Sequence, residues 1–291
     1  MFDWENLRHF VAVARAGTLS GAARALNVDH ATVGRRVAAL EAELQVRLLD
    51  RLPRHCSLTA AGERILELAT EMEADAYAIE RALRADQPHL VGTVVVSAPP
   101  VLVTNFFAPA AAAFRTLHPG IQLALSGEAQ SVSLSRREAD IAVRLVRPTE
   151  SGNVTRHLGT LEFALYAAQN YVHRLTPSKW EFIAYDSGFD ATPQQEWLRK
   201  TAGHRPIACK ISDITSHYAA ACNGAGVAGL PSFLPRAGDG LVRLDTEAES
   251  FSREIWLVVH RDLKSAPAIR AVMDFIIDLV ESTPALQTAQ P

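Results

Sequence analysis

The sequence is poor in cysteine and lacks a long apolar run. Its three cysteines, in 291 residues, form no CxxC pair, so neither a disulfide framework nor a thiolate metal site is indicated. The longest apolar stretches fall well short of the ~18 residues of a membrane helix, and acids stand near the start where a secretion signal would carry bases. We therefore expect a cytoplasmic protein that binds no metal and does not contact a membrane, with a redox-sensing Cys209/Cys222 pair left open.

Motifs of catalysis are also missing. The ten histidines are scattered without an HExxH, and no GxSxG or P-loop occurs. Residues 224–229 fit GxGxxG with Asp245 downstream, but residues 215–223 look helical, so the glycines end a helix instead of following a strand. We expect no enzyme and no cofactor. A secreted solute-binding protein is the other alternative, but it would carry a secretion signal and no basic bias on its first helices.

Charge is unevenly distributed along the chain. The net charge is −3, yet residues 1–58 hold eight arginines against six acids, a surplus of two, which leaves −5 for the remainder. Lysine is absent before Lys179. Because arginine reads guanine and grips phosphate with a planar fork, this segment is a candidate for binding nucleic acid through a local patch. The length favours two domains.

The N-terminal pattern indicates three helices. Apolar residues at helical spacing predict a helix from Trp4 that stops at Gly17, Thr18 can cap a short helix over 19–26, and Asp29 can cap a third. The buried face of the third helix comprises Val33, Val37, Leu40 and Leu44. Its opposite face carries His30, Thr32, Arg35 and Arg36. This order is that of a helix-turn-helix, whose second helix enters the major groove of DNA.

Residues 48–59 hold two short apolar stretches around Arg51, Arg54 and His55, which predicts a β-hairpin. We interpret it as a wing that contacts phosphates or the minor groove. The alternative is that these arginines only solvate a small helical domain. The succession of helix, helix, basic helix and basic hairpin favours the DNA-binding interpretation.

From Thr59 a near-heptad apolar seam predicts a long helix that ends before a hinge at residues 87–89. The seam comprises Ile65, Leu68, Met72, Ala76, Ile79 and Leu83. Such a helix most simply pairs with its copy in a second subunit, which would present two recognition helices to a two-fold DNA site. The alternative is that the seam packs on the domain's own core.

The first sixty residues resemble the LysR-type transcriptional regulators. The matching stretches are residues 7–13, 18–26, 33–37 with Leu40–Glu41, and 58–62. The family commonly opens its recognition helix with Ser-Gln where this chain has Asp29–His30, and Gly34 replaces a common serine; these departures bear on the preferred base sequence. The resemblance implies base and phosphate contacts from Thr32, Arg35 and Arg36. The DNA-contacting residues we expect are Thr18, Ser20, His30, Ala31, Thr32, Arg35, Arg36, Arg51, Arg54 and His55.

Strand patterns at residues 93–97, 121–125, 139–144 and 161–166 alternate with helical patterns and predict a mostly parallel sheet, with ligands beyond the strand C-termini. The resemblance continues at residues 97–99, 108–109, 118–119, 140–144 and 226–231. It implies a two-lobed α/β effector-binding domain similar to type 2 periplasmic binding proteins. The expected domains are 1–58 (winged helix-turn-helix), 59–90 (linker helix and hinge) and 91–291, with lobe one at 91–161 and 266–291, lobe two at 162–265, and a closing helix over 268–280.

Polar residues at the predicted strand ends are candidates for a ligand cleft. They are Ser97, Pro99, Gln130, Ser131, Arg144, Tyr185, Ser187 and Asp213. Each alone could be an ordinary loop or capping residue, and Arg144 could either favour an organic anion or pair with Glu162. The sequence thus predicts a DNA-binding transcriptional regulator of the LysR type, acting on double-stranded DNA as a homodimer or homotetramer under a small-molecule effector, with RNA polymerase left open as a partner.

Overall fold

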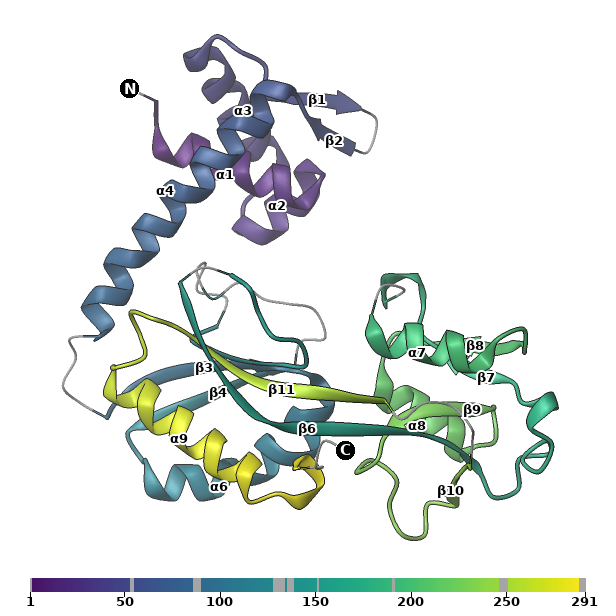
Figure 1. The fold of residues 1–291 in the computed structure, drawn as a ribbon. Helices are drawn as coiled ribbons and strands as arrows, with labels where there is room; N and C mark the ends of the chain where they lie inside the picture. Colours follow the sequence, from purple (N-terminus) through teal and green to yellow (C-terminus); the bar gives the residue numbers. More distant parts are fainter. Residues whose placement is uncertain are drawn as a thin grey trace. The chain divides into compact units, whose positions relative to one another are not determined.

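The computed structural model describes residues 2–52, 55–85, 90–127, 134, 139–150, 152–189, 192–245 and 251–287. The chain divides into two compact units, Met1–Leu83 and Arg84–Pro291 (Figure 1). Among the described residues, no helix combines the length and the apolar character that crossing a membrane requires.

The first unit contains the three predicted helices, the hairpin and the long helix. Their bounds are α1 Trp4–Ala16, α2 Leu19–Leu26, α3 His30–Leu44, β1 Leu49–Leu52, β2 His55–Leu58 and α4 Ala60–Ala85. The caps explain where the helices begin: Thr18 Oγ1 accepts from the backbone N–H of Gly21 at 3.0 Å, and Asp29 Oδ1 accepts from that of Thr32 at 2.8 Å. Gly17, with φ of 65°, ends α1 in the left-handed conformation.

The hairpin and the residue before it are fixed to the helices by hydrogen bonds from their backbone N–H groups. Glu41 Oε1 on α3 accepts from the N–H groups of Leu48 and Leu49 at 2.8 and 3.1 Å, and Cys56 N–H donates to the Gly17 carbonyl at 2.8 Å. A Cβ on Gly62 would lie 2.1 Å from the Leu48 carbonyl oxygen, so α4 begins against β1 at a distance that only glycine permits. These contacts hold the hairpin beside α3.

The apolar seam of α4 is partly buried and partly exposed. Ile65 is half-buried and Ala69 is buried against the core of the unit. Leu68, Met72 and Ile79 are instead 58%, 44% and 67% exposed. Part of the helix therefore packs on its own domain, as the alternative interpretation held, and the other part leaves an apolar stripe in solvent.

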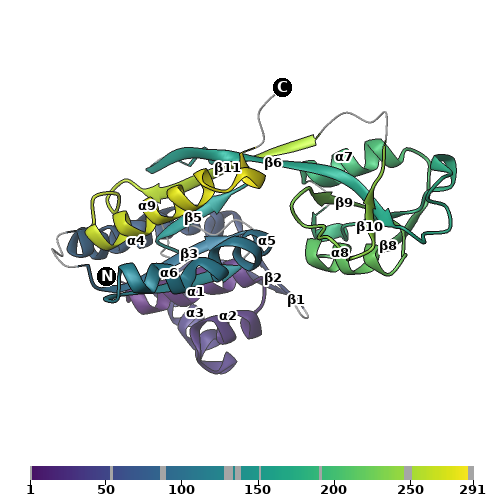
Figure 2. The same cartoon turned by 90° about the horizontal axis from the view of Figure 1, so that it is seen from below.

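The second unit is an α/β structure with two lobes (Figures 1 and 2). Its strands follow the order β4-β3-β5-β11-β6-β9-β7-β8, with β10 on β6. The parallel pairs lie within the lobes, whereas β6 (Asn153–Ala168) and β11 (Phe251–His260) pair antiparallel with each other and with their neighbours. The prediction of a mostly parallel sheet is wrong for these two strands, because the chain runs out to the second lobe along β6 and returns along β11.

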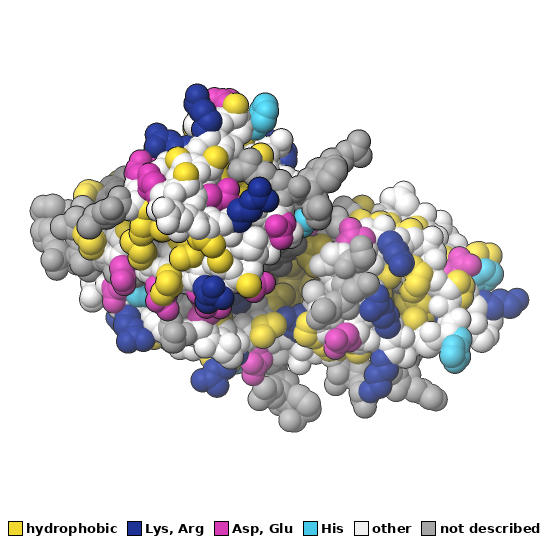
Figure 3. Space-filling model, turned by 90° about the horizontal axis from the view of Figure 1, so that it is seen from above, with side chains coloured by type: hydrophobic (Ala, Val, Ile, Leu, Met, Phe, Trp, Pro, Cys, Tyr) yellow, Lys and Arg dark blue, Asp and Glu magenta, His cyan; other side chains and the backbone are white. Residues whose placement is uncertain are grey.

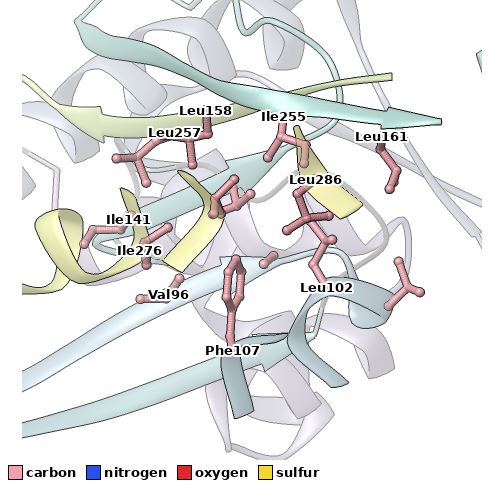
Figure 4. Close-up of a cluster of buried hydrophobic side chains, with 14 of the residues drawn as sticks. Val96, Leu102, Phe107, Ile141, Leu158, Leu161, Ile255, Leu257, Ile276 and Leu286 are labelled. Carbon is pink, nitrogen blue, oxygen red and sulfur yellow. The ribbon is translucent and has the colours of Figure 1, made fainter. Parts of the chain in front are cut away.

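The first lobe contains β3 Gly92–Ala98, β4 Ile121–Gly127 and β5 Ile141–Arg144, with α5 Pro100–Leu102, the π-helical turn η1 Val103–Phe107, α6 Ala108–Leu117 and α9 Pro267–Glu281. Apolar side chains from the sheet and from these helices meet in its core. Figure 4 shows Val96, Ile141, Phe107 and Ile276 among them. The predicted closing helix over 268–280 is confirmed as α9.

The second lobe contains β7 Phe182–Ala184, β8 Ile207–Lys210, β9 Val227–Pro231, β10 Leu241–Arg243, α7 Pro193–Ala202 and α8 Ile214–Cys222. The glycine-rich motif follows α8 and continues into β9, with φ of 77° at Gly224 and 153° at Gly226. A Cβ on Gly226 would approach the Glu181 carbonyl oxygen to 2.6 Å. The glycines thus end a helix, as predicted, and do not open one as a dinucleotide site requires.

Candidate functional site

The first turns of α3 present polar side chains to solvent. His30, Ala31 and Arg35 are exposed and Thr32 is half-buried. Thr32 Oγ1 donates to Asp29 Oδ2 at 2.8 Å and accepts from Arg35 Nη2 at 3.1 Å. Hydrogen bonds from Thr32 lower the pKa of the Asp29 carboxyl. This relay orients the guanidinium of Arg35 on the exposed face of the helix.

Arg36 differs from its neighbour. Its Nη1 donates to Asp3 Oδ2 and to Asn6 Oδ1, each at 3.2 Å, while its side chain is 43% exposed. It therefore links α3 to the start of α1. We conclude that Arg36 has a structural role in joining α3 to α1, in addition to any contact that it makes with a ligand.

The other predicted members of this face lie on α2 and on the hairpin. Thr18 is engaged in capping α2, and Ser20 is exposed on its first turn. His55 is exposed at the start of β2, and its ring lies against Gly17. Arg51 belongs to β1 but its side chain is not among those described, and Arg54 lies outside the described residues.

A cavity of about 520 Å³ opens in the second unit between elements of the two lobes. Its walls come from the C-terminal ends of the parallel strands β3, β5, β7 and β9, and from β6 and β11. Four predicted residues line this cavity: Pro99, Arg144, Tyr185 and Asp213. Figure 3 shows apolar side chains exposed on the second lobe, at the right of the view.

Ser97 lies behind the cavity wall. It is fully buried, and its carbonyl oxygen and Oγ accept from Arg144 Nη1 and Nη2 at 3.0 and 3.2 Å. Ser97 therefore positions Arg144. Glu162 pairs with Arg243 at 2.8 Å, so the alternative pairing of Arg144 with Glu162 is not what forms.

The side chains of three further predicted cleft residues are not among those that the structure describes. Gln130 and Ser131 lie outside the described residues, and so does the side chain of Ser187, whose backbone begins the 3-10 turn η3 (Ser187–Phe189).

Arg253 is a cavity residue that sequence reasoning missed. It is only 9% exposed on β11, its Nε donates to the Leu145 carbonyl oxygen at 3.0 Å, and its Nη1 donates to Gln194 Oε1. Arg253, Ile255 and Leu257 alternate along the strand and face the same buried side of the sheet. An arginine at a position that the alternation assigns to the buried side is the sequence signal for this residue.

Three ionisable groups by the second-lobe wall have distinct states. Burial raises the pKa of Tyr185 to about 12, which keeps the phenol protonated. Burial pushes the pKa of Asp213 upward, but hydrogen bonds from Thr215 and Ser216 at the start of α8 outweigh it, and the net shift is downward. Burial lowers the pKa of His217, whose ring centroid lies 4.5 Å from that of Tyr185. Asp213 is therefore ionised near neutral pH, and its carboxylate is already occupied in capping α8.

The lobes also touch through a second group of residues. Arg236 Nη2 donates to Asn105 Oδ1 at 3.0 Å, and the rings of Phe106 and Phe233 meet edge to face with centroids 4.8 Å apart. Asp239 Oδ2 accepts from the backbone N–H of Arg236 at 2.6 Å, and this bond closes the loop that precedes β10. Asn105 and Phe106 belong to the π-helical turn η1, so this contact joins the first lobe to the second through η1.

Two of the three cysteines have a raised thiol pKa. All three are free, and burial raises the pKa of Cys209 and of Cys222. Protonated thiols are poor nucleophiles.

A winged helix-turn-helix and a two-lobed α/β unit with a cavity between its lobes define a DNA-binding regulator that responds to a ligand. Residues 4–63 match the bacterial regulatory helix-turn-helix proteins of the lysR family, and residues 87–281 match the LysR substrate binding domain. The chain belongs to the LysR family. It is a DNA-binding transcriptional regulator with an effector-binding domain, and its relatives are regulators and not enzymes.

Named relatives span most of the chain. The Mau operon transcriptional activator of Paracoccus denitrificans is 26% identical over 97% of this chain and 98% of its own, and the AhcY transcriptional activator HvrB of Rhodobacter capsulatus is 32% identical over 77% and 80%. The solved structures of ArgP from Mycobacterium tuberculosis (TM-score 0.60, 22% identity, 100% of both chains) and of CrgA from Neisseria meningitidis (TM-score 0.56, 24% identity, 96% of this chain and 99% of that one) share the fold.

Proposed function

We propose that α3 reads bases in the major groove and that the β1–β2 hairpin contacts the DNA backbone. The main support for this proposal is the exposed face of α3, where hydrogen bonds between Asp29, Thr32 and Arg35 orient the Arg35 guanidinium. A guanidinium held in one direction loses less freedom when it pairs with a base edge. His30 and Thr32 would add base contacts, whereas Arg36, tied to Asp3, would contribute mainly by keeping α3 in place.

We also propose that two copies pair through α4. Leu68, Met72 and Ile79 are each more than two-fifths exposed on one stripe of this helix. A second copy offers the same stripe in a two-fold arrangement, which buries both at once and presents two α3 helices to DNA. Pairing of two such dimers into a tetramer, contact with RNA polymerase, action in the cytoplasm and the domain limits at residues 58 and 90 remain predictions.

The cavity would receive the effector. A ligand that contacts both lobes binds one arrangement of the lobes more tightly than another. Only this difference in affinity allows the ligand to change how the dimer binds DNA. Arg236 and Asn105 would strengthen or release their contact as the lobes shift.

Fluorescence anisotropy on the DNA upstream of the protein's own gene, across a salt series, tests DNA reading by α3. We expect tight, salt-dependent binding that exceeds binding to unrelated DNA. Arg35→Ala should weaken it roughly 10- to 100-fold. Arg8→Ala is the matched control, since Arg8 lies on α1 beside Glu5 at 3.4 Å, and it should change binding less than about threefold. Equal losses in both variants, or no preference over unrelated DNA, would contradict the proposal.

A further inference from the structure

Arg253 is a buried cation, and none of the described residues is its counter-ion. Its contacts within the described chain are the Leu145 carbonyl oxygen and the Gln194 amide oxygen, both neutral. Its Nη2 donates to none of the described residues. A buried charge is normally paired, because desolvation costs more than a neutral acceptor returns.

The surroundings of Arg253 supply a second donor. The Gln194 side chain, which accepts from Arg253, also lies close enough to the Tyr185 hydroxyl to lower the pKa of the phenol in part. Tyr185 is neutral and protonated, so it can donate to an anion but cannot provide the missing negative charge. Gln194 therefore joins the two donors at one part of the cavity wall.

Other charged groups also line the cavity among the described residues. Three arginines and two acids are among the lining residues: Arg144, Arg147, Arg253, Glu150 and Asp213. Asp213 is occupied by capping α8, and Glu150 accepts from Asn153 at 3.3 Å. Neither acid is paired with Arg253.

Most of the other residues that line the cavity are apolar. Strand ends and turns contribute Pro99, Val101, Phe163, Phe189, Ile214 and Pro231. A volume of about 520 Å³ lies in the range of small-ligand sites. A bare inorganic ion would leave most of this apolar surface facing water, whereas a compact hydrocarbon body would cover it.

We propose that the effector is a small organic monoanion, a carboxylate on an apolar body, whose anionic group pairs with Nη2 of Arg253 and accepts from the Tyr185 hydroxyl. This assignment rests on the proposed function of the cavity. Arg253 lies on β11, one of the two strands that join the lobes, beside the register shift at Ile255/Trp256. Neutralising it with a ligand therefore acts on the strand that sets the lobe arrangement.

The test uses the full chain and pairs of compounds that differ only in charge. Benzoate, phenylacetate, 2-naphthoate and isovalerate are compared with their neutral amides, and acetate, phosphate and phenyl phosphate are added. Thermal unfolding ranks the compounds and isothermal titration gives Kd. We expect the carboxylates with apolar bodies to raise the unfolding midpoint more than their amides, more than acetate and phosphate, and more than phenyl phosphate, because Arg253 offers a single positive charge.

Variants separate Arg253 from the general charge of the cavity. Arg253→Gln should weaken carboxylate binding roughly 10- to 100-fold, and Arg253→Lys, which keeps the charge and serves if the first variant unfolds, should retain more of it. Arg147→Gln is the control, because Arg147 is exposed, lies over the Trp256 ring at 5.1 Å, and should matter less than threefold.

Binding of amides as tight as that of the acids, full binding by Arg253→Gln, or no binding by any carboxylate would overturn the anion proposal. Amides that bind and alter DNA binding would leave the regulator function standing while the anion proposal fails. Loss of sequence preference on DNA in the same preparations would instead mark a failure of the proposed function.

Discussion

Replacing Leu68 with lysine should split the dimer that we propose. Leu68 is 58% exposed in one copy of the chain, and the pairing of two α4 helices would remove that surface from water. Lysine at the same position would bring an ammonium group from each subunit to the helix–helix seam.

The size of the effect follows from the exposed area. Complete burial of a leucine side chain is worth about 1.5–3 kcal/mol. With 58% of Leu68 still exposed, its burial in the dimer should contribute about 1–2 kcal/mol per subunit, or about 2–4 kcal/mol per dimer. Leu68→Lys should therefore raise the dimer Kd roughly 30- to 1000-fold.

Sedimentation velocity over a concentration series measures this Kd. Glu67→Lys is the matched control, because Glu67 is an exposed residue of the same helix turn outside the apolar stripe, and its dimer Kd should stay within about threefold. Both variants should keep the helix content of the parent chain. A dimer Kd that is unchanged in Leu68→Lys, or equally raised in Glu67→Lys, would refute the α4 interface.

Three other substitutions test local parts of the account. Gly62→Ala should destabilise the first unit by at least about 1 kcal/mol in urea unfolding, since its Cβ would meet backbone, whereas Gly34→Ala in open space on α3 should stabilise it by about 0.5–1 kcal/mol. Equal effects would contradict this packing. A double-mutant cycle on Asn105→Ala and Arg236→Ala should show a coupling of about 0.5–1 kcal/mol in the second unit, and additive losses would exclude the interlobe contact. Because the Asp29 carboxyl has a lowered pKa, its stabilisation is complete at neutral pH and is lost as the pH falls through the folded pKa. Asp29→Asn should therefore flatten the acid side of the stability curve, and an unchanged curve would argue against the Thr32 contacts.

The first unit could be predicted from sequence almost element by element. Its signals are local: Thr18 and Asp29 cap helices, Gly17 ends one, and the apolar spacing marks the buried faces. The exposed face of α3 follows from the same spacing. The tie between Arg36 and Asp3 could not be predicted, because it joins residues 33 positions apart whose contact depends on how α1 crosses α3.

The second unit was harder because its signals are not local. Strand existence followed from short apolar runs, but the antiparallel direction of β6 and β11 depends on the path of the chain between lobes. Pro99, Arg144, Tyr185 and Asp213 were predicted from their places after strands or before a helix and do line the cavity. Arg253 was missed because it stands inside a strand, where no turn residue marks it.

Hydroxyl-radical footprinting of the full chain on the DNA upstream of its gene tests the central claim most directly, namely that a dimer reads DNA through α3. The account predicts two protected half-sites related by two-fold symmetry, with centres spaced by whole helical turns, both lost in Arg35→Ala and retained in Arg8→Ala. Uniform protection along the DNA, or the same two half-sites protected by Arg35→Ala, would contradict it.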